Sequence, residues 1–194
     1  RWMKYVEQGG NLVLTCRTGQ KDRFGRFPEA PFGAMLDKLT GNRIDFYDLL
    51  LPDIPGKVSM DGTDYLWNTW GEILVPGKEN EVWATYKDEF YDGRPAVTFR
   101  RLGKGTVTYI GVDTRDGKLE RRILDKLYAR LQIPVLDLPY GITLEYRNGF
   151  GIVLNYSDRP YHFNLPDDSK VMIGTPDIPT AGVLVFKSQM KSSE

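Results

Sequence analysis

The side chains best suited to covalent chemistry are a single cysteine and a single histidine. Cys16 ends a predicted strand over 11–16, a position at which amidotransferase-type folds carry a nucleophile. A nucleophile in such a turn needs small neighbours, and here they are Thr15 and Arg17. His162 falls in a different predicted domain. We therefore interpret Cys16 as a buried structural residue, and an amidotransferase-like enzyme that uses Cys16 stays open as an alternative.

The 26 carboxylates offer many acid–base pairs, but their spacing selects none of them. We expect solvation of those beside loops, namely Asp22, Glu29, Asp88, Glu89, Asp92 and Asp113. Gly103-Lys104-Gly105 lacks the first glycine and the Ser or Thr of a phosphate-binding loop, so it is interpreted as a turn. His162 has no second histidine with which to share a metal. No catalytic, cofactor-binding or metal-binding residue is assigned.

Aromatic residues gather between positions 65 and 91: Tyr65, Trp67, Trp70, Trp83, Tyr86, Phe90 and Tyr91. They could stack on sugars, which would suit a stand-alone carbohydrate-binding or scaffolding module. Packing in a core or at a subunit interface is the favoured interpretation, because aromatic side chains serve those roles more often.

Charge and hydropathy exclude several classes of partner. Lys plus Arg and Asp plus Glu both total 26, and no segment concentrates basic residues, so we expect no nucleic acid partner. No apolar stretch approaches the roughly 20 residues that span a bilayer, so we expect no membrane partner. A lone cysteine cannot form an internal disulfide. The compartment is left unassigned, with the cytoplasm favoured over secretion.

The elements that would position these residues begin inside an α/β unit. A helical pattern over 2–8 runs through Gly9-Gly10 into the strand 11–16, so we expect that the chain was cut from a longer polypeptide. A short helix over 34–39, antiparallel strands over 43–86, a glycine-flanked hairpin over 95–110 and a helix over 117–131 follow. The first domain is predicted to span residues 1–133.

Pro134 marks the predicted boundary, because proline ends a helix and stiffens the chain that leaves it. Beyond it, short alternating runs predict five strands, over 142–147, 151–156, 161–165, 170–174 and 183–186. A small antiparallel β-sandwich over residues 134–194 is the expected second domain.

These segments resemble a known family. The run from Tyr5 to Asp22 (YVEQGGNLVLTCRTGQKD), followed by Ala30-Pro31-Phe32-Gly33 and Tyr47-Asp48, resembles the middle domain of the family 42 glycoside hydrolases, the β-galactosidases. The run YDGRPAVT over 91–98, with LGKG over 102–105 and YIG over 109–111, is similar to the end of that domain. Residues 142–186, including LNYS over 154–157, resemble the small C-terminal domain.

The resemblance implies an α/β fold class: an amidotransferase/flavodoxin-like domain, N-terminally truncated and with antiparallel additions, followed by the small β-sandwich. In the family a TIM barrel precedes these domains and carries both catalytic glutamates, and the middle domain mediates homotrimer assembly. The full-length enzyme would hydrolyse terminal β-D-galactosides with retention, one carboxyl acting as nucleophile and the other as acid and then base. The resemblance thus implies a non-catalytic C-terminal region that serves assembly, needs no cofactor and meets galactosides only through the absent barrel.

The residues expected at the subunit interface come from the polar loop 17–26 and from the aromatic stretch 65–91, because interfaces favour Arg, Tyr and Trp. Some of them could also wall the active site of the neighbouring subunit. The candidates are Arg17, Asp22, Arg23, Phe24, Trp67 and Trp70.

Overall fold

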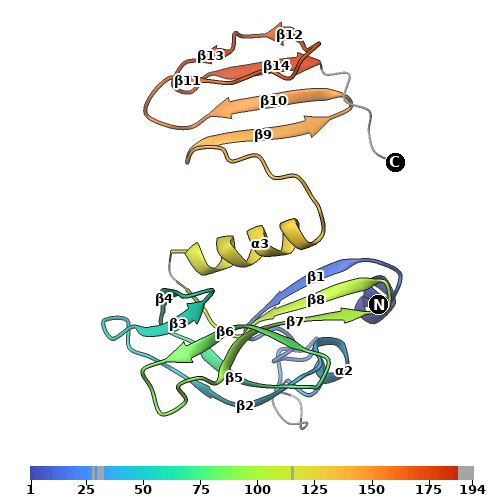
Figure 1. The fold of residues 1–194 in the computed structure, drawn as a ribbon, viewed down its shortest axis with the longest axis vertical. Coiled ribbons are helices and arrows are strands. Elements are labelled where there is room, and N and C mark those ends of the chain that lie inside the picture. The colour runs from blue at the N-terminus through green and yellow to red at the C-terminus, as the bar shows by residue number, and fades with distance from the viewer. Residues whose placement is uncertain (28, 30–32, 115, 188–194) are drawn as a thin grey trace. The chain divides into compact units, whose positions relative to one another are not determined.

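The computed structural model describes residues 1–27, 29, 33–114 and 116–187. Ala30, Pro31 and Phe32 of the family-like sequence lie outside this set, as do residues 188–194. The chain divides into two compact units, Arg1–Ile133 and Pro134–Glu194, and each is described by itself (Figure 1).

The first unit is built on a six-stranded sheet in the order β1-β8-β7-β6-β3-β4. The pair β1/β8 is parallel, and the other neighbouring pairs are antiparallel. A flavodoxin-like sheet would be mainly parallel, whereas the described part of this chain is mostly strand with antiparallel neighbours. The bounds are β1 Asn11–Thr15, β3 Gly56–Met60, β4 Thr63–Trp67, β6 Glu81–Lys87, β7 Pro95–Leu102 and β8 Gly105–Ile110.

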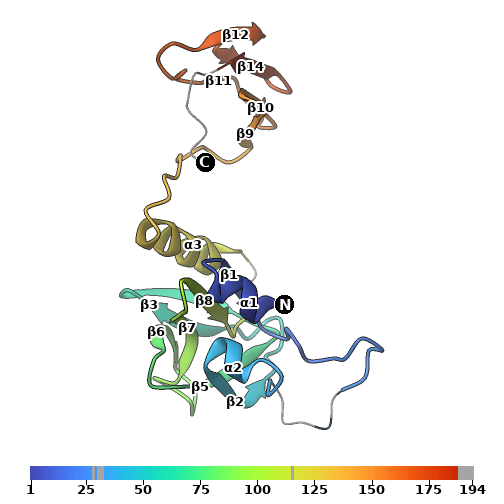
Figure 2. The same ribbon diagram turned by 90° about the vertical axis from the view of Figure 1, so that its right-hand side faces the viewer.

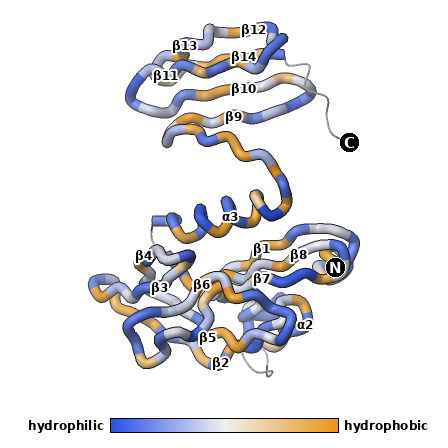
Figure 3. The backbone as a smooth tube through the Cα atoms, viewed as in Figure 1, coloured by the Kyte–Doolittle hydropathy of each residue, from blue (hydrophilic) through white to orange (hydrophobic). Residues whose placement is uncertain are grey.

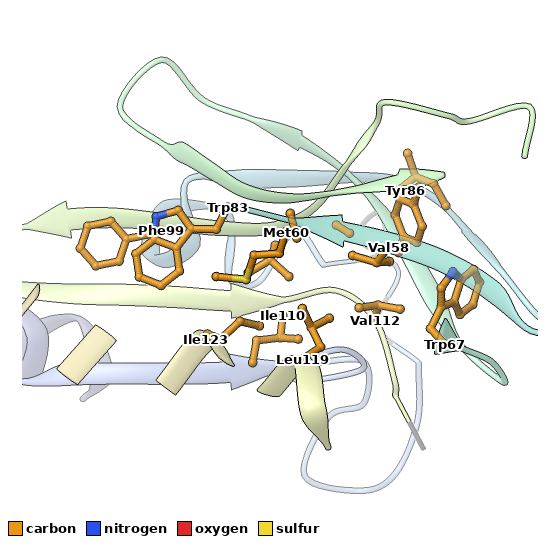
Figure 4. Close-up of a cluster of buried hydrophobic side chains, with 14 of the residues drawn as sticks. Val58, Met60, Trp67, Trp83, Tyr86, Phe99, Ile110, Val112, Leu119 and Ile123 are labelled. Carbon is orange, nitrogen blue, oxygen red and sulfur yellow. The ribbon is translucent and has the colours of Figure 1, made fainter. Parts of the chain in front are cut away.

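One face of this sheet is covered by α3 (Lys118–Arg130), the helix that the sequence pattern predicts. Hydrophobic and hydrophilic residues alternate along it (Figure 3), and its buried side is formed by Leu119, Ile123 and Leu127. These three pack with Met60, Ile110 and the rest of the main core (Figure 4). Burial of each such side chain contributes roughly 1.5–3 kcal/mol, so the helix is held by packing more than by its own hydrogen bonds.

The opposite face is covered by the antiparallel ribbon of β2 (Asn42–Asp48) and β5 (Gly71–Pro76), together with α1 (Trp2–Glu7) and α2 (Asp37–Thr40). Residues such as Val6, Leu39 and Leu74 pack there against Val107 and Tyr109 of β8. Because β8 is covered on both faces, all six of its residues are buried. The expected helix over 34–39 is reduced to the short α2, which ends at Gly41 in the left-handed conformation.

The predicted hairpin of β7 and β8 is confirmed, and its turn explains the glycines at 103 and 105. Gly103 has a φ of 60°, and the Lys104 N–H donates to the Glu7 carbonyl at 3.1 Å. A Cβ on Gly105 would collide with the carbonyl oxygens of Gly10 and Val6. The turn therefore packs against the link between α1 and β1, as a structural element and not as a phosphate loop.

The second unit contains a four-stranded antiparallel sheet in the order β12-β14-β10-β9 and a small β11/β13 pair. Asn148 and Gly149, both at positive φ, form the predicted tight turn between β9 and β10. Only Tyr161 and His162 of the expected strand 161–165 are strand, and β13 was not foreseen because two residues carry no periodicity. The bounds are β9 Ile142–Arg147, β10 Phe150–Asn155, β11 Tyr161–His162, β12 Lys170–Ile173, β13 Asp177–Ile178 and β14 Val183–Lys187.

No helix among the residues that the structure describes has the length and apolarity that a membrane span requires. In the same residues, no three His, Cys, Asp or Glu side chains form a group that could hold a metal ion.

Candidate functional site

The parallel pairing of β1 and β8 brings their carboxyl ends together. Thr15 pairs with Ile110, so the segment that begins at Cys16 and the segment 111–114 leave the sheet side by side. The start of β5 joins them, because the Glu72 N–H donates to the Gly111 carbonyl at 2.6 Å. The carboxyl ends of parallel strands are the usual place for functional sites in α/β sheets, and several polar side chains gather at the ends of β1 and β8.

Glu72 organises this edge of the sheet. Its side chain is 0% exposed, and Oε1 accepts hydrogen bonds from the Arg17 backbone N–H at 2.8 Å and from the Trp70 Nε1–H at 3.1 Å. Oε2 accepts a hydrogen bond from the Tyr109 hydroxyl at 2.7 Å. Burial raises the pKa of Glu72, and these hydrogen bonds offset part of the rise. The carboxylate therefore connects three segments that are distant in sequence.

Arg17 and Trp70, two of the predicted interface residues, are brought together by this network. The Arg17 guanidinium lies 5.0 Å from the centre of the Trp70 ring, and Tyr47 stacks on the same indole with ring centres 4.4 Å apart. Arg17 has a φ of 66° and Thr69 a φ of 77°. Each such non-glycine residue costs roughly 1–2 kcal/mol, so the strained backbone on either side of the cluster is held by its contacts.

Asp22, Arg23 and Phe24 form a second cluster, in the 22–26 turn. The Asp22 carboxylate accepts the N–H groups of Phe24 and Arg26 at 2.8 and 3.0 Å, and the Asp22 N–H donates to the Arg26 carbonyl at 2.8 Å. Phe24 is 63% exposed, with the guanidinium groups of Arg23 and Arg26 at 4.6 and 5.1 Å from its ring centre. The segment after β1 extends away from the sheet (Figure 2), so this closed turn presents an aromatic ring between two cations.

The prediction for Trp67 is wrong. Its side chain is 1% exposed and packs edge-on to Tyr86 at 5.5 Å, in the core that also holds Val58 and Val112 (Figure 4). A residue so deeply buried cannot contact a second subunit. Tyr47, which is 48% exposed beside Trp70, was part of the family-like Tyr47-Asp48 pair but was not predicted as an interface residue.

Cys16 does not have the environment of a nucleophile. Burial raises the pKa of its thiol to about 12, and the negative charges of Glu72 and Asp113 add to the rise. A catalytic thiol needs the opposite shift. The left-handed residue of this turn is Arg17 and not the cysteine. His162 belongs to the second unit, where its Nδ1 lies 2.6 Å from the Asp177 carboxylate. The cysteine-enzyme alternative therefore has no support here.

The raised pKa predicts a slow reaction of Cys16 with thiol reagents. At pH 8 a shift from the ordinary 9.0 to about 12 lowers the thiolate fraction by about three orders of magnitude. We expect labelling by an aromatic disulfide reagent to be at least about 100-fold slower in the folded chain than in the denatured chain. Absorbance of the released thiolate measures both rates. Equal rates under the two conditions would contradict the raised pKa of this half-buried thiol.

Comparisons with known proteins assign this architecture. The family model described as the β-galactosidase trimerisation domain matches residues 1–138, and the model described as the β-galactosidase C-terminal domain matches residues 141–188. The chain belongs to the family 42 glycoside hydrolases. The predicted resemblance is thus confirmed, and the chain corresponds to the trimerisation and C-terminal domains of that family. A stand-alone binding module and a cysteine-dependent enzyme are not favoured.

Individual relatives agree with the family. β-Galactosidase BgaA of Clostridium cellulovorans is 32% identical over 176 residues, which cover 88% of this chain and 26% of the relative. BgaH of Haloferax lucentense is 28% identical over 170 residues, with 88% and 26% covered. The family 42 chain therefore spans about a quarter of the length of these curated relatives.

Solved structures show the same fold. The β-galactosidase of the haloarchaeon Halorubrum lacusprofundi is 28% identical, with a TM-score of 0.81 over 95% of this chain and 28% of that one. The cold-adapted β-galactosidase of Rahnella sp. R3 has a TM-score of 0.84 over 97% of this chain and 30% of its own. At 23% identity the Rahnella comparison speaks for the fold alone.

Proposed function

We propose that residues 1–133 form an amidotransferase-like domain that assembles into a homotrimer, and that residues 134–194 form the small all-β C-terminal domain. The protein as a whole hydrolyses terminal β-D-galactosides, with catalytic carboxylates supplied from outside these residues. The observation that carries this proposal is the match of residues 1–138 to a domain family described by trimerisation. Neither a nucleic acid nor a membrane is among the proposed partners.

The amidotransferase-like assignment is supported by one part of the sheet. β1 and β8 are parallel neighbours, α3 covers the sheet beside them, and Cys16 stands directly after β1. The antiparallel strands β6, β3 and β4 are then additions to this nucleus. Such a domain retains the sheet edge at which amidotransferase-type folds carry their catalytic residues. In this chain Glu72 and Arg17 lie at that edge and are joined by a hydrogen bond.

The proposed contact surface consists of Arg17, Asp22, Arg23 and Phe24, with Trp70, which is buried at 8% exposure, packed against the guanidinium of Arg17. Arginine and exposed aromatic residues carry most of the binding energy in protein interfaces, and the 22–26 turn presents both types. Its backbone is closed by Asp22, so little conformational entropy is lost when a neighbouring subunit binds. The same turn walls the neighbour's galactoside site in this proposal, with the ring of Phe24 and the cation of Arg23 facing the sugar.

The experiment compares the chain with a version that ends at Ile133. The first unit has its own hydrophobic clusters, which share no residue with the cluster of the second unit, so we expect the shortened chain to fold. Light scattering should give the mass of a trimer for both. A trimeric full chain that becomes a folded monomer on truncation would move the interface to the second unit, and a monomeric full chain would overturn trimer formation by these residues.

A further inference from the structure

A cleft in the second unit combines aromatic faces with groups that form hydrogen bonds. Its volume is about 720 Å³, and its lining includes Tyr140, Tyr156, Tyr161, Ser157, Asp158 and Arg159. This volume lies in the range of small-molecule sites. The tyrosine rings can contact an apolar surface of a ligand. The carboxylate of Asp158 and the guanidinium of Arg159 can form hydrogen bonds with the polar groups at the edge of that ligand.

Two tyrosines present their rings to solvent. Tyr140 is 102% exposed and Tyr156 is 71% exposed. Their backbones are tied together, because the Tyr156 N–H donates to the Gly141 carbonyl at 2.7 Å. The turn that holds Tyr140 is closed by a hydrogen bond from the Ile142 N–H to the Pro139 carbonyl at 3.0 Å. The backbones that carry the two rings are thus fixed relative to each other before any ligand arrives.

Asn155 supports the segment 157–159 of the cleft through hydrogen bonds. Its side chain is 1% exposed, and its amide Nδ2 donates to the carbonyls of Arg159 at 2.8 Å and Ile178 at 3.1 Å. Its Oδ1 accepts hydrogen bonds from the backbone N–H and the hydroxyl of Ser157, at 2.9 and 2.6 Å. A buried, fully bonded residue under a short exposed segment is the support that a preorganised binding site needs.

We propose that this cleft binds galactose-terminated saccharides. One face of a β-galactoside gathers several C–H groups, because the axial hydroxyl points to the other side, and this apolar face suits the ring of Tyr156 or Tyr140. The hydroxyls on its rim suit the carboxylate of Asp158 and the guanidinium of Arg159, which lie 3.5 Å apart. Because these two charges have opposite signs and offset each other, the cleft favours a neutral polyol over a phosphate. The choice of galactose rests on the proposed function, and the cleft would retain substrate without acting on it.

Saturation-transfer NMR on the 194-residue chain tests this site with methyl β-D-galactoside as the probe. We expect a dissociation constant on the order of 1 mM, which is ordinary for a ligand of this size. Tyr156→Ala should weaken binding at least about tenfold, whereas Tyr156→Phe, which keeps the ring, should stay within about threefold. Tyr5→Ala, an exposed tyrosine of the first unit, is the matched control and should change nothing. Methyl β-D-glucoside, which differs only at the axial hydroxyl, should bind more weakly.

The proposal fails if the folded chain shows no transfer to the galactoside at tens of millimolar, if Tyr156→Ala binds as well as the unchanged chain, or if the glucoside binds equally. Thermal unfolding of each variant confirms folding, because the substituted side chain is exposed and its loss should leave the melting temperature unchanged. The result is independent of oligomeric mass, so a monomer that binds galactoside would fail the proposed assembly but support the cleft.

Discussion

Glu72→Ala is expected to lower the free energy of unfolding of the first unit by about 4 kcal/mol, the largest stability effect that we foresee for a single substitution. The side chain is fully buried and accepts hydrogen bonds from Arg17, Trp70 and Tyr109. Its removal leaves two buried donors, on Trp70 and Tyr109, and the half-buried Arg17 N–H without an acceptor, and each buried donor costs roughly 1–3 kcal/mol. It also releases the strained backbone at Arg17.

Urea unfolding followed by tryptophan fluorescence measures this loss. Glu72→Gln, which keeps one acceptor but turns an amide N–H₂ toward the donors, should lie between alanine and the unchanged chain. Glu145→Ala is the control, because Glu145 is exposed on β9, and it should change stability by less than about 0.5 kcal/mol. A loss below about 1 kcal/mol for Glu72→Ala would mean that the network is not closed in solution.

The same residue gives a pH dependence of defined sign. Because burial raises the pKa of Glu72 above the ordinary 4.5, the unfolded chain releases this proton at a lower pH than the folded chain. The folded state binds more protons in that interval, so this residue makes stability fall as the pH rises from 4.5 through the raised pKa. Glu72→Gln should lack this component. A steeper decline in the glutamine variant would contradict the direction of the shift.

Phe24→Ala is expected to raise the dissociation constant of the proposed homotrimer by at least about 30-fold, which corresponds to a loss of roughly 2 kcal/mol at one contact. The ring is exposed in the single chain and lies between two guanidinium groups, so its truncation removes the centre of the proposed contact. Since this side chain makes little contribution to the core, the melting temperature of the dissociated chain should stay unchanged.

Sedimentation equilibrium gives the dissociation constant, with Tyr5→Ala as the control for loss of an exposed aromatic ring elsewhere in the unit. Asp22→Ala provides an independent test, because it opens the 22–26 turn and leaves the ring in place. It should weaken assembly by a smaller factor, through lost preorganisation. An unchanged dissociation constant in Phe24→Ala would place the interface away from this turn.

Local sequence patterns predicted the elements whose partners are close in the chain. The β7/β8 hairpin, the Asn148-Gly149 turn and α3 are confirmed, since their periodicity and turn chemistry are set within a few residues. Trp67 was misplaced because strand alternation does not say which face is covered. The layers that cover each face of the sheet come from segments that are distant in sequence, so only the folded chain shows which face is buried.

Glu72 was not recognised, although a signal was present. It alternates in the sequence with the apolar Trp70 and Leu74, and a carboxylate between two such residues indicates a buried polar network. What no local pattern could supply is the identity of its partners. Arg17 lies 55 residues before it and Tyr109 lies 37 residues after it.

The parallel pairing of β1 with β8 has a consequence for how the chain folds during synthesis. Asn11 and Thr106, which pair across these strands, are 95 residues apart, so a ribosome must make almost the whole first unit before β1 finds its neighbour. Closing a loop of that length costs conformational entropy before the contact contributes any stabilisation, so pairings of this kind form slowly. Of the strands described, the first to be made is therefore among the last to be paired. Its free edge stays open to other chains for the whole of that time.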